Sequence, residues 1–260
     1  MKKLFALLVT LLLLAGCGEN IKGGDWEAIQ KRGYIVVAME GAWEPWTYHD
    51  AETNELVGYD VEVGKYIADY LGLEARFVEG AWDGLLAGVD GGRYDMMING
   101  CDITDERQAA YDFSTPYARD IIVVITRSDD DRITTMEDLN GMDTANTISS
   151  TYAKIAEQYG AKVKGIDDLN DTFLELESKR IDATLNSEPS YEGYMASNPD
   201  AQFKIACYYD FDKNPYVGIA MKKGSSALVE KVNEAIEAAK ADGTLTKLSI
   251  KYFGKDVNNQ

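Results

Sequence analysis

Apolar positions recur along the chain with two different spacings. Short apolar runs typical of buried strands occupy residues 34–40, 74–80 and 94–100. Between them, residues 57–72 and 82–92 carry apolar positions at helical spacing, and each segment ends at a glycine, which favours the end of a helix. This repeated strand–helix–strand order predicts an α/β domain with mainly parallel strands, in which ligand chemistry takes place at their carboxyl ends.

A second unit with the same pattern follows the apolar segment DIIVVITRSDDD at residues 120–131. Its predicted strands lie at 141–147, 161–166 and 182–186, and its predicted helices at 150–160, 169–180 and 189–197. The chain then returns as a predicted strand at 215–224, followed by two helical segments at 226–243 and 244–254. No low-complexity linker separates the units. We therefore expect two α/β lobes joined by crossing strands, with a cleft between them.

The first 17 residues, MKKLFALLVTLLLLAGC, have the plan of a secretory signal. Two lysines precede an apolar run at 4–15, which is too short for a comfortable membrane span. The ending LAGC resembles a bacterial lipobox, so we predict a signal peptide at 1–16, lipidation of Cys17 and a flexible tether at 17–25. The protein would then be lipid-anchored outside the cytoplasmic membrane, on a Gram-positive cell surface or in a periplasm. The alternative is an ordinary cleaved signal with an incidental cysteine.

Composition narrows the possible functions. The 260 residues include 26 basic and 44 acidic side chains, and no basic cluster lies outside the extreme N-terminus, so we expect no nucleic-acid binding. His49 is the only histidine, so no Cys/His metal spacing exists and a Ser/His/Asp triad would depend on it alone. We expect neither a metal nor a cofactor. Cys101 and Cys207 could pair in an oxidising compartment, but pairing depends on their Cα separation.

Five segments carry a family resemblance. They are GYDVEVGKYIADYLG, WDGLLAGVDGGRYDMMINGCDITDERQAAYDFSTPY, RIDATLN, YVGIAMKKG and DGTLTKLSIKYFG. In this order and spacing the chain, over about residues 26–254, resembles the bacterial extracellular solute-binding proteins of family 3, which deliver polar amino acids to ABC transporters. The segment TISSTYAKIAEQYGAKVKGID further resembles the cystine-binding subgroup.

The resemblance implies a Venus-flytrap fold whose two α/β lobes close by hinge motion on one small ligand. Residues 26–118 and 217–260 would form lobe 1, and residues 119–216 would form lobe 2. The expected partners are an amino acid or related zwitterion, a transporter permease and the membrane through the N-terminal lipid. We expect a monomer.

The resemblance also implies ligand-binding roles for individual residues. Arg107 stands at the position of the family's carboxylate-binding arginine, where a planar guanidinium makes two parallel charge-assisted bonds. Backbone amides from Gly100 to Asp102 would supplement it. Trp43 and Trp82 fall where the family places aromatic side chains against the ligand. Trp46 could either contact the ligand or belong to the core. The alternative for Arg107 is a surface arginine in an acidic helix start.

From lobe 2, Ser150 and Thr151 precede a predicted helix and would close over the carboxylate with the first helix amides. The alternative is ordinary N-capping, and both roles can hold at once.

Two positions depart from the family pattern. Many relatives have a small or hydroxyl residue where this chain has Asp102, and most have an ammonium-binding aspartate where it has Ser187. Asp102 could point to solvent or cap a turn, with Glu40 or Glu188 replacing the missing ammonium partner. It could itself bind an ammonium, in which case the ligand lies differently or carries extra positive charge. The third possibility is a pocket that no longer holds a standard amino acid.

Three classes of function remain open at this point. The leading hypothesis is the substrate-binding lipoprotein of an ABC importer, which is not an enzyme. A cyclohexadienyl-dehydratase-like enzyme on the same fold would need a general acid, for which Glu40, Asp102 and Glu188 are the available carboxylates. The absence of histidine from the pocket segments argues against this enzyme. The third hypothesis is a ligand-sensing module for a separate signalling partner.

Overall fold

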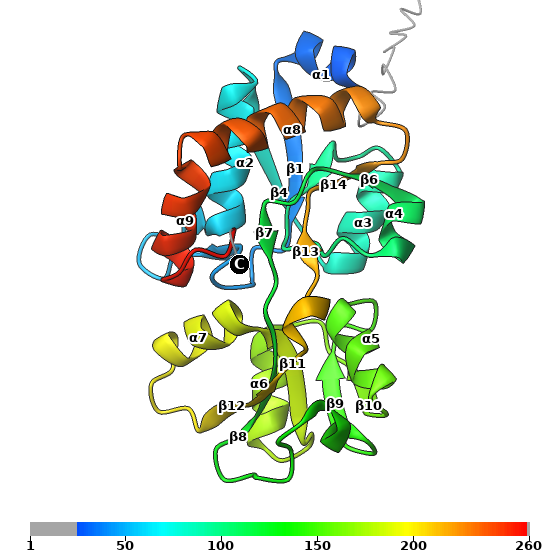
Figure 1. Ribbon diagram of the computed structural model, residues 1–260. Helices are drawn as coiled ribbons and strands as arrows, with labels where there is room; N and C mark the ends of the chain where they lie inside the picture. The colour runs from blue at the N-terminus through cyan, green and yellow to red at the C-terminus, as the bar shows by residue number, and fades with distance from the viewer. Residues whose placement is uncertain (1–24, 259–260) are drawn as a thin grey trace, which may run out of the picture.

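The protein consists of two α/β lobes joined by two extended segments (Figure 1). A computed structural model describes residues 25–258. The crossing segments pair with each other as an antiparallel ladder between β7 (Ala118–Arg119) and β13 (Tyr216–Val217). The boundaries expected between the lobes, 118/119 and 216/217, fall within this pair. A cleft between lobes therefore lies beside the point where the chain crosses twice.

Lobe 1 is built on a five-stranded sheet with the order β4-β1-β5-β14-β6. Its strands are β4 (Glu74–Glu79), β1 (Tyr34–Met39), β5 (Met96–Met97), β14 (Ala220–Lys222) and β6 (Tyr111–Phe113). Its helices are α1 (Trp26–Arg32), α2 (Tyr59–Tyr70), α3 (Trp82–Asp90), α4 (Asp105–Ala110), α8 (Ser226–Ala241) and α9 (Thr244–Phe253), and a small hairpin joins β2 (Tyr48–His49) to β3 (Leu56–Val57).

The two faces of this sheet bury different helices because successive side chains of a strand point to opposite sides. Ile35 and Val37 of β1 face a large core with residues of α2, α8 and α9. Ala38 faces the other way, into a smaller core with α3. The carboxyl ends of β1 and β5 emerge between these layers at the cleft, which places the loop after β5 next to lobe 2.

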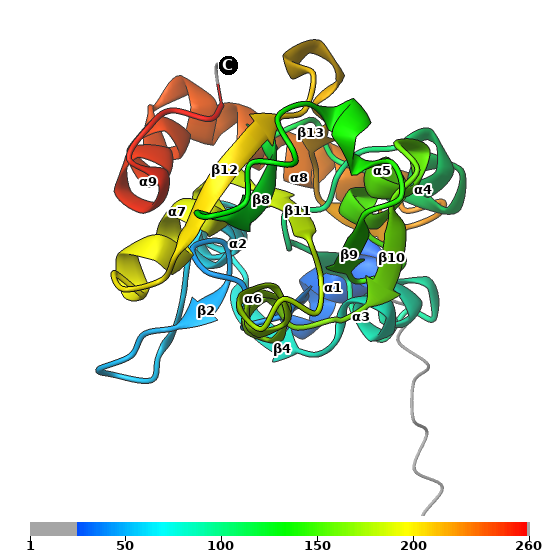
Figure 2. The ribbon, with the colours of Figure 1, turned by 90° about the horizontal axis from the view of Figure 1, so that it is seen from below.

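Lobe 2 has the same plan, and Figure 2 shows its strand order from β12 at one edge to β10 at the other. The strands are β10 (Lys162–Gly165), β9 (Asp143–Asn146), β11 (Ala183–Ser187), β8 (Ile122–Arg127) and β12 (Phe203–Tyr208). One face packs against α5 (Thr151–Gln158) and the short 3-10 helix η1 (Met136–Leu139), and the other against α6 (Leu169–Glu177) and α7 (Glu188–Ser197). A second 3-10 helix, η2 (Phe211–Lys213), precedes the return to lobe 1.

The structure differs from the sequence-based expectation in several elements. Each sheet is mixed, with one strand opposed to the other four: β14 pairs antiparallel with β5 and β6 in lobe 1, and β8 pairs antiparallel with β11 and β12 in lobe 2. The predicted strand at 215–224 is split into β13 and β14 around Gly218, where an added Cβ would lie 2.7 Å from Ile103. Helix α1 and strand β12 were not predicted.

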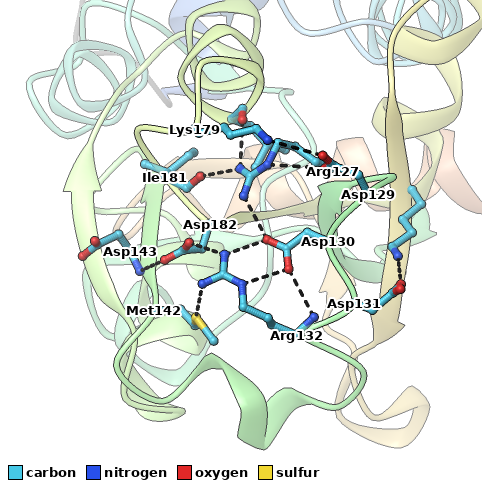
Figure 3. Close-up of polar contacts among 12 residues, drawn as sticks. Arg127, Asp129, Asp130, Asp131, Arg132, Met142, Asp143, Lys179, Ile181 and Asp182 are labelled. Carbon is cyan, nitrogen blue, oxygen red and sulfur yellow. Dashed lines mark hydrogen bonds and ion pairs between the residues drawn. The ribbon is translucent and has the colours of Figure 1, made fainter.

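A network of arginines and aspartates closes the far end of lobe 2 (Figure 3). Arg127 donates to the backbone oxygens of Leu176 and Ile181 at 3.0 and 2.8 Å, and to Asp130 at 2.9 Å. Arg132 donates to Asp130 at 2.6 Å and to Asp182 at 2.5 Å. Each charge in this group thus lies against an opposite charge or a carbonyl, which is how a buried guanidinium avoids the cost of desolvation.

The cysteines lie in different lobes, Cys101 in the loop after β5 and Cys207 in β12, and both are free thiols. Between residues 25 and 258, no helix has both the length and the apolar composition that a membrane crossing requires. The predicted signal peptide and Cys17 lie outside the described residues.

Candidate functional site

A cavity of about 90 Å³ lies between the two lobes. Lobe 1 contributes Glu40, Ala42, Trp43, Trp82, Gly100, Asp102 and Arg107. Lobe 2 contributes Asn146, Thr147, Ser150, Thr151, Tyr152, Ile166, Asp167, Asp168, Leu169, Thr172 and Asn186. Eight of the nine predicted ligand-binding residues therefore line the cavity, and Arg107 is the only basic residue among the described residues that line it.

Arg107 is buried at the floor of this cavity, with 7% of its surface exposed. It sits in the first turn of α4, where the Thr104 hydroxyl caps the helix by accepting from the Arg107 amide at 3.2 Å. Its guanidinium donates to the backbone oxygen of Asp102 at 3.1 Å and, across the cleft, to that of Ser149 at 3.4 Å. A guanidinium has five N–H donors, so several stay free for a carboxylate.

The buried carboxylate of Asp60 holds the loop before Arg107 in place. Asp60, at the start of α2, accepts from the Gly100 amide at 2.6 Å and from the Tyr117 hydroxyl at 2.7 Å. Burial raises the pKa of Asp60 to about 7, although the hydrogen bonds from Tyr117 and Gly100 oppose this shift. Gly100 lines the cavity, but its amide is already engaged, so our expectation that this N–H serves the ligand was wrong.

Gly100 is needed because it has a positive φ and no side chain. Its φ is +51°, and an added Cβ would lie 2.4 Å from the Trp43 ring. The absence of a side chain lets the indole lie directly on the loop.

Two aromatic rings form the walls of the cavity on the lobe 1 side. Trp43 stacks on Trp46 with ring centroids 5.3 Å apart, and its Nε1 donates to the Asn186 side chain of lobe 2 at 3.2 Å. The Trp82 ring lies 4.9 Å from the Arg107 guanidinium carbon, and its buried Nε1 has no hydrogen-bond partner among the described residues. Trp46 is a core residue with 1% of its surface exposed.

Lobe 2 presents the start of α5 to the cavity. Ser150 caps the helix by accepting from the Ala153 amide at 3.1 Å. The Thr151 Oγ1 and the Asn146 Oδ1 are buried beside the cavity and have no partner within residues 25–258. The Thr151 hydroxyl lies close enough to Asp102 to lower the pKa of that carboxyl, so the Asn146 oxygen is the clearer candidate for a bond to a ligand.

Ser187 lies outside the cavity lining. Its hydroxyl caps α7 by accepting from the Ser190 amide at 3.2 Å, and it also accepts from the Trp46 indole at 3.2 Å. It is fully buried. The position at which the resemblance implied an ammonium-binding residue thus forms a contact between the lobes.

Asp102 is buried in the cavity wall, with 4% of its surface exposed, which excludes the solvent-facing alternative. Its Oδ2 lies 3.9 Å from the Arg107 Nη1, too far for a hydrogen bond, and its Oδ1 has no partner among the described residues. Burial raises the pKa of Asp102, although the Arg107 charge opposes the shift. The carboxyl is therefore positioned to accept from a ligand.

A second buried carboxyl lies next to Asp102 in the crossing segment. Asp120 accepts from the Tyr152 hydroxyl at 2.8 Å, and burial together with the Asp102 charge raises its pKa well above the usual range. Tyr152 lines the cavity, so it separates Asp120 from the ligand space.

Glu40 stands at the carboxyl end of β1 and is fixed by two hydrogen bonds with Asn99. The Asn99 amide donates to the Glu40 carboxylate at 2.7 Å, and the Asn99 oxygen accepts from the Glu40 backbone at 2.7 Å. Burial raises the pKa of Glu40 to about 7, and the charges of Asp167 and Asp168 across the cleft add to the shift. By contrast, Glu188 lies outside the cavity lining and contacts Lys255 and the Tyr208 hydroxyl.

Sequence reasoning missed Asn146, Asn186, Tyr152 and Asp167 as cavity residues. Asn146 and Asn186 lie in the C-terminal parts of β9 and β11, a position that by itself indicates ligand contact in an α/β sheet. Asp167 is the last residue before the helix cap of α6 and carried no separate signal. Within the described part of the chain, no group of three or more His, Cys, Asp or Glu residues is arranged to hold a metal ion.

Two α/β lobes joined by a double crossing, with a polar cavity between them, define a solute-binding protein. The model of the bacterial extracellular solute-binding proteins, family 3, matches residues 35–255. The chain belongs to this family, as the motifs had predicted.

Named relatives agree with the assignment. The chain is 37% identical over 268 aligned positions to the L-cystine-binding protein TcyA of Bacillus subtilis (strain 168), and the match covers 99% of each chain. Among solved structures, an ancestral arginine-binding protein bound to glutamine is 36% identical with a TM-score of 0.80, covering 86% of this chain and 99% of the other. Both relatives are binding proteins.

One structural relative is relevant to the hypothesis that the chain is an enzyme. The ancestral amino acid-binding protein AncCDT-1, a precursor of cyclohexadienyl dehydratase, is 28% identical with a TM-score of 0.79 and covers 87% of this chain and 98% of the other. It too is named as an amino acid-binding protein.

Proposed function

We propose that the chain is the substrate-binding lipoprotein of an ABC importer and captures a polar amino acid or related zwitterion between its lobes. The observation that carries this proposal is the buried pair of opposite charges in the cavity, Arg107 and Asp102, which are 3.9 Å apart and not hydrogen-bonded through their side chains. An α-amino acid carries its carboxylate and ammonium only two bonds apart. The two protein charges match that separation.

In this proposal each cavity wall has a role. Arg107 holds the ligand carboxylate, helped by the lobe 2 groups Ser150 and Thr151 at the start of α5. Asp102 accepts from the ammonium, a role that Ser187 cannot take because it caps α7 away from the cavity. Trp43 and Trp82 enclose the ligand and exclude water, which strengthens both charge pairs.

The ligand is best identified by a thermal-shift screen of residues 25–260 against the standard amino acids, cystine, small peptides and polyamines. A ligand that binds the folded protein raises the unfolding midpoint by mass action. Cystine is included because TcyA is an L-cystine-binding protein. We expect at least one amino acid to shift the midpoint, with isothermal titration calorimetry confirming one site. A flat panel would overturn the proposal.

We further propose that Cys17 carries the lipid anchor, that the protein works as a monomer outside the cytoplasmic membrane, and that a transporter permease is its partner. The lipobox-like ending LAGC and the family's extracellular character support this. Labelling cells with a radioactive fatty acid should mark the unaltered chain and not Cys17→Ala. Analytical ultracentrifugation checks the monomer, and loss of amino acid uptake on deletion checks the permease. A transcriptional defect without an uptake defect would instead favour a sensing module.

The similarity to AncCDT-1 supports a second candidate function, that of an enzyme that dehydrates cyclic dienyl acids. The general acid would be Glu40, whose pKa of about 7 suits proton transfer near neutral pH, or Asp102. Glu188 is excluded from this role by its pairing with Lys255 outside the cavity lining. We expect no product from prephenate or arogenate, and product formation that is lost in Glu40→Gln would favour the enzyme.

A further inference from the structure

We propose that the cavity selects an amino acid with a second cationic group on its side chain, which is held between Glu40 of lobe 1 and Asp167 and Asp168 of lobe 2. This inference rests on the proposed function, because it assumes that Arg107 and Asp102 hold the backbone charges of the ligand. It goes further by naming the class of ligand.

The first support is the balance of charge around the cavity. Its lining contains four acids, Glu40, Asp102, Asp167 and Asp168, against one base, Arg107. A neutral zwitterion would use one acid and one base, which leaves three carboxyl groups without an opposite charge. A ligand with an additional cation removes much of this excess.

The second support is the placement of these acids. Glu40 follows the end of β1, while Asp167 and Asp168 precede α6 in the other lobe. Asn99, itself fully buried, fixes the Glu40 carboxylate through its side-chain amide at 2.7 Å. The three acids line the same cavity from opposite lobes. The charges of Asp167 and Asp168 add to the upward shift of the Glu40 pKa. Approach of the lobes brings like charges together, which opposes closure unless a cation lies between them.

The third support is a buried carboxyl oxygen of Asp102. Asp102 is 4% exposed and lines the same cavity, and its Oδ1 has no hydrogen-bond partner in the described chain. A buried carboxyl oxygen without a donor is costly, so the cavity is built for a ligand that supplies one. With Asp102 occupied by the α-ammonium, the acids at Glu40, Asp167 and Asp168 remain for a side-chain cation.

The same balance argues against cystine as the preferred ligand. Cystine carries two carboxylates and two ammoniums. Its second ammonium would suit the acids, but its second carboxylate would enter a cavity whose only base among the described residues is Arg107. Burying an unpaired carboxylate among acids is strongly unfavourable. The ligand preference inferred here thus differs from that in the name of the relative TcyA.

The decisive measurement compares ligands of equal shape and different charge. Calorimetry on residues 25–260 should show that L-arginine binds at least about tenfold more tightly than L-citrulline, or L-lysine than L-norleucine, where tenfold corresponds to about 1.4 kcal/mol. L-cystine should bind more weakly than the preferred cationic amino acid. Equal or tighter binding of the neutral members, or of cystine, would overturn the inference and leave the proposed function intact. No binding by any amino acid would overturn both.

Variants locate the effect in the proposed acids. Glu40→Gln and Asp167→Asn should each reduce the ratio of cationic to neutral affinity about three- to tenfold, since each removes one facing charge. Both retain the shape of the side chain, and Asp167 is exposed, so folding is preserved. Asp168 also caps α6 by accepting from the Asp171 amide, which makes it the less informative variant. Asp200→Asn, the same charge change outside the cavity lining, should leave the ratio unchanged; a similar loss in this control would overturn the assignment.

Discussion

Two buried arginine–aspartate pairs in this molecule are arranged in opposite ways. At the far end of lobe 2, the Arg127 Nη2 lies 2.9 Å from the Asp130 carboxylate, and Arg132 donates to the same group (Figure 3). In the cavity, the Arg107 Nη1 lies 3.9 Å from the Asp102 carboxylate, and one oxygen of that carboxylate has no partner among the described residues. All four of these paired residues are less than 10% exposed.

The pKa values show the physical consequence. Hydrogen bonds from Arg132, more than any other cause, lower the pKa of Asp130 to about 2. For Asp102, burial dominates and raises the pKa, and the arginine nearby only reduces the shift. The first pair is hydrogen-bonded within the protein and contributes to stability, although the Arg127 Nε has no hydrogen-bond partner among the described residues. The second pair interacts at a longer distance, without a hydrogen bond between the two side chains.

Removing Arg107 should have the largest effect on ligand binding. In Arg107→Ala we expect the affinity for the ligand to fall by about 3–5 kcal/mol, because a buried carboxylate loses its charged partner. Titration calorimetry measures this change. Arg76→Ala, at an exposed arginine outside the cavity lining, is the matched control and should bind normally. An affinity within threefold of the unaltered protein would show that Arg107 does not hold the ligand.

The network in lobe 2 should affect stability instead. We expect Asp130→Asn to lower the free energy of unfolding by about 2–3 kcal/mol, since Arg127 would keep its buried charge without a full partner. Ligand affinity should not change. Urea unfolding gives the first quantity and calorimetry the second.

Asp129→Asn is the control for this network, because Asp129 is 69% exposed and its contact with Lys179 is 3.3 Å long. Its effect should stay below about 0.5 kcal/mol. If both variants destabilise the protein equally, the buried pair has no special role.

Asp102→Asn should have the opposite effect to Asp130→Asn, because it should change ligand affinity more than stability. Its free energy of unfolding should change by less than about 1 kcal/mol, because the Asp102 carboxylate is not hydrogen-bonded to Arg107 through its side chain. Affinity should fall by about 1.4 kcal/mol, a factor of ten, and selectivity among amino acids should change. Unchanged affinity across the panel would mean that Asp102 does not contact the ligand.

The smallest expected effect is that of pH, which should act differently on the cavity and on the lobe 2 network. Binding of the cationic ligand proposed above should require ionised Glu40, whose pKa is about 7, so affinity should fall by up to about tenfold between pH 8 and pH 6. Glu40→Gln should flatten this dependence in a calorimetric pH series. A profile identical in both proteins would contradict the role given to Glu40.

The Asp130 pair should respond only in acid. Its folded pKa of about 2 lies below the usual 3.8, so its contribution to stability is complete above about pH 4 and is lost as the pH falls toward 2. Acid unfolding curves of the unaltered protein and Asp130→Asn should therefore converge at low pH.

The sequence allowed the two-lobe architecture and the loop with Arg107 to be predicted, because both depend on local patterns. Apolar runs, helix-ending glycines and family motifs each occupy contiguous residues. Helix α1 was missed although Asp25 caps its start and Gly33 ends it, so its signals were present. Strand β12 is an edge strand with partly buried residues, and its pattern was too weak to separate it from a loop.

The cavity could be predicted only in part, since it depends on contacts between distant segments. Asn146, Asn186 and Asp167 meet Arg107 because two sheets place their strand ends at one cleft. Ser187 was expected at the ligand, but its hydroxyl turns to the start of α7, where helix amides need an acceptor. Whether Asp102 is buried could not be decided from its neighbours in the sequence.

The bond between Trp46 and Ser187 gives the protein a built-in optical reporter. The Trp46 indole, 1% exposed, donates across the cleft to lobe 2, and the stacked Trp43 does the same through Asn186. Separation of the lobes would break both bonds and admit water to the two rings. Their fluorescence should then shift to longer wavelength, so ligand-driven movement can be followed in real time without attaching a dye.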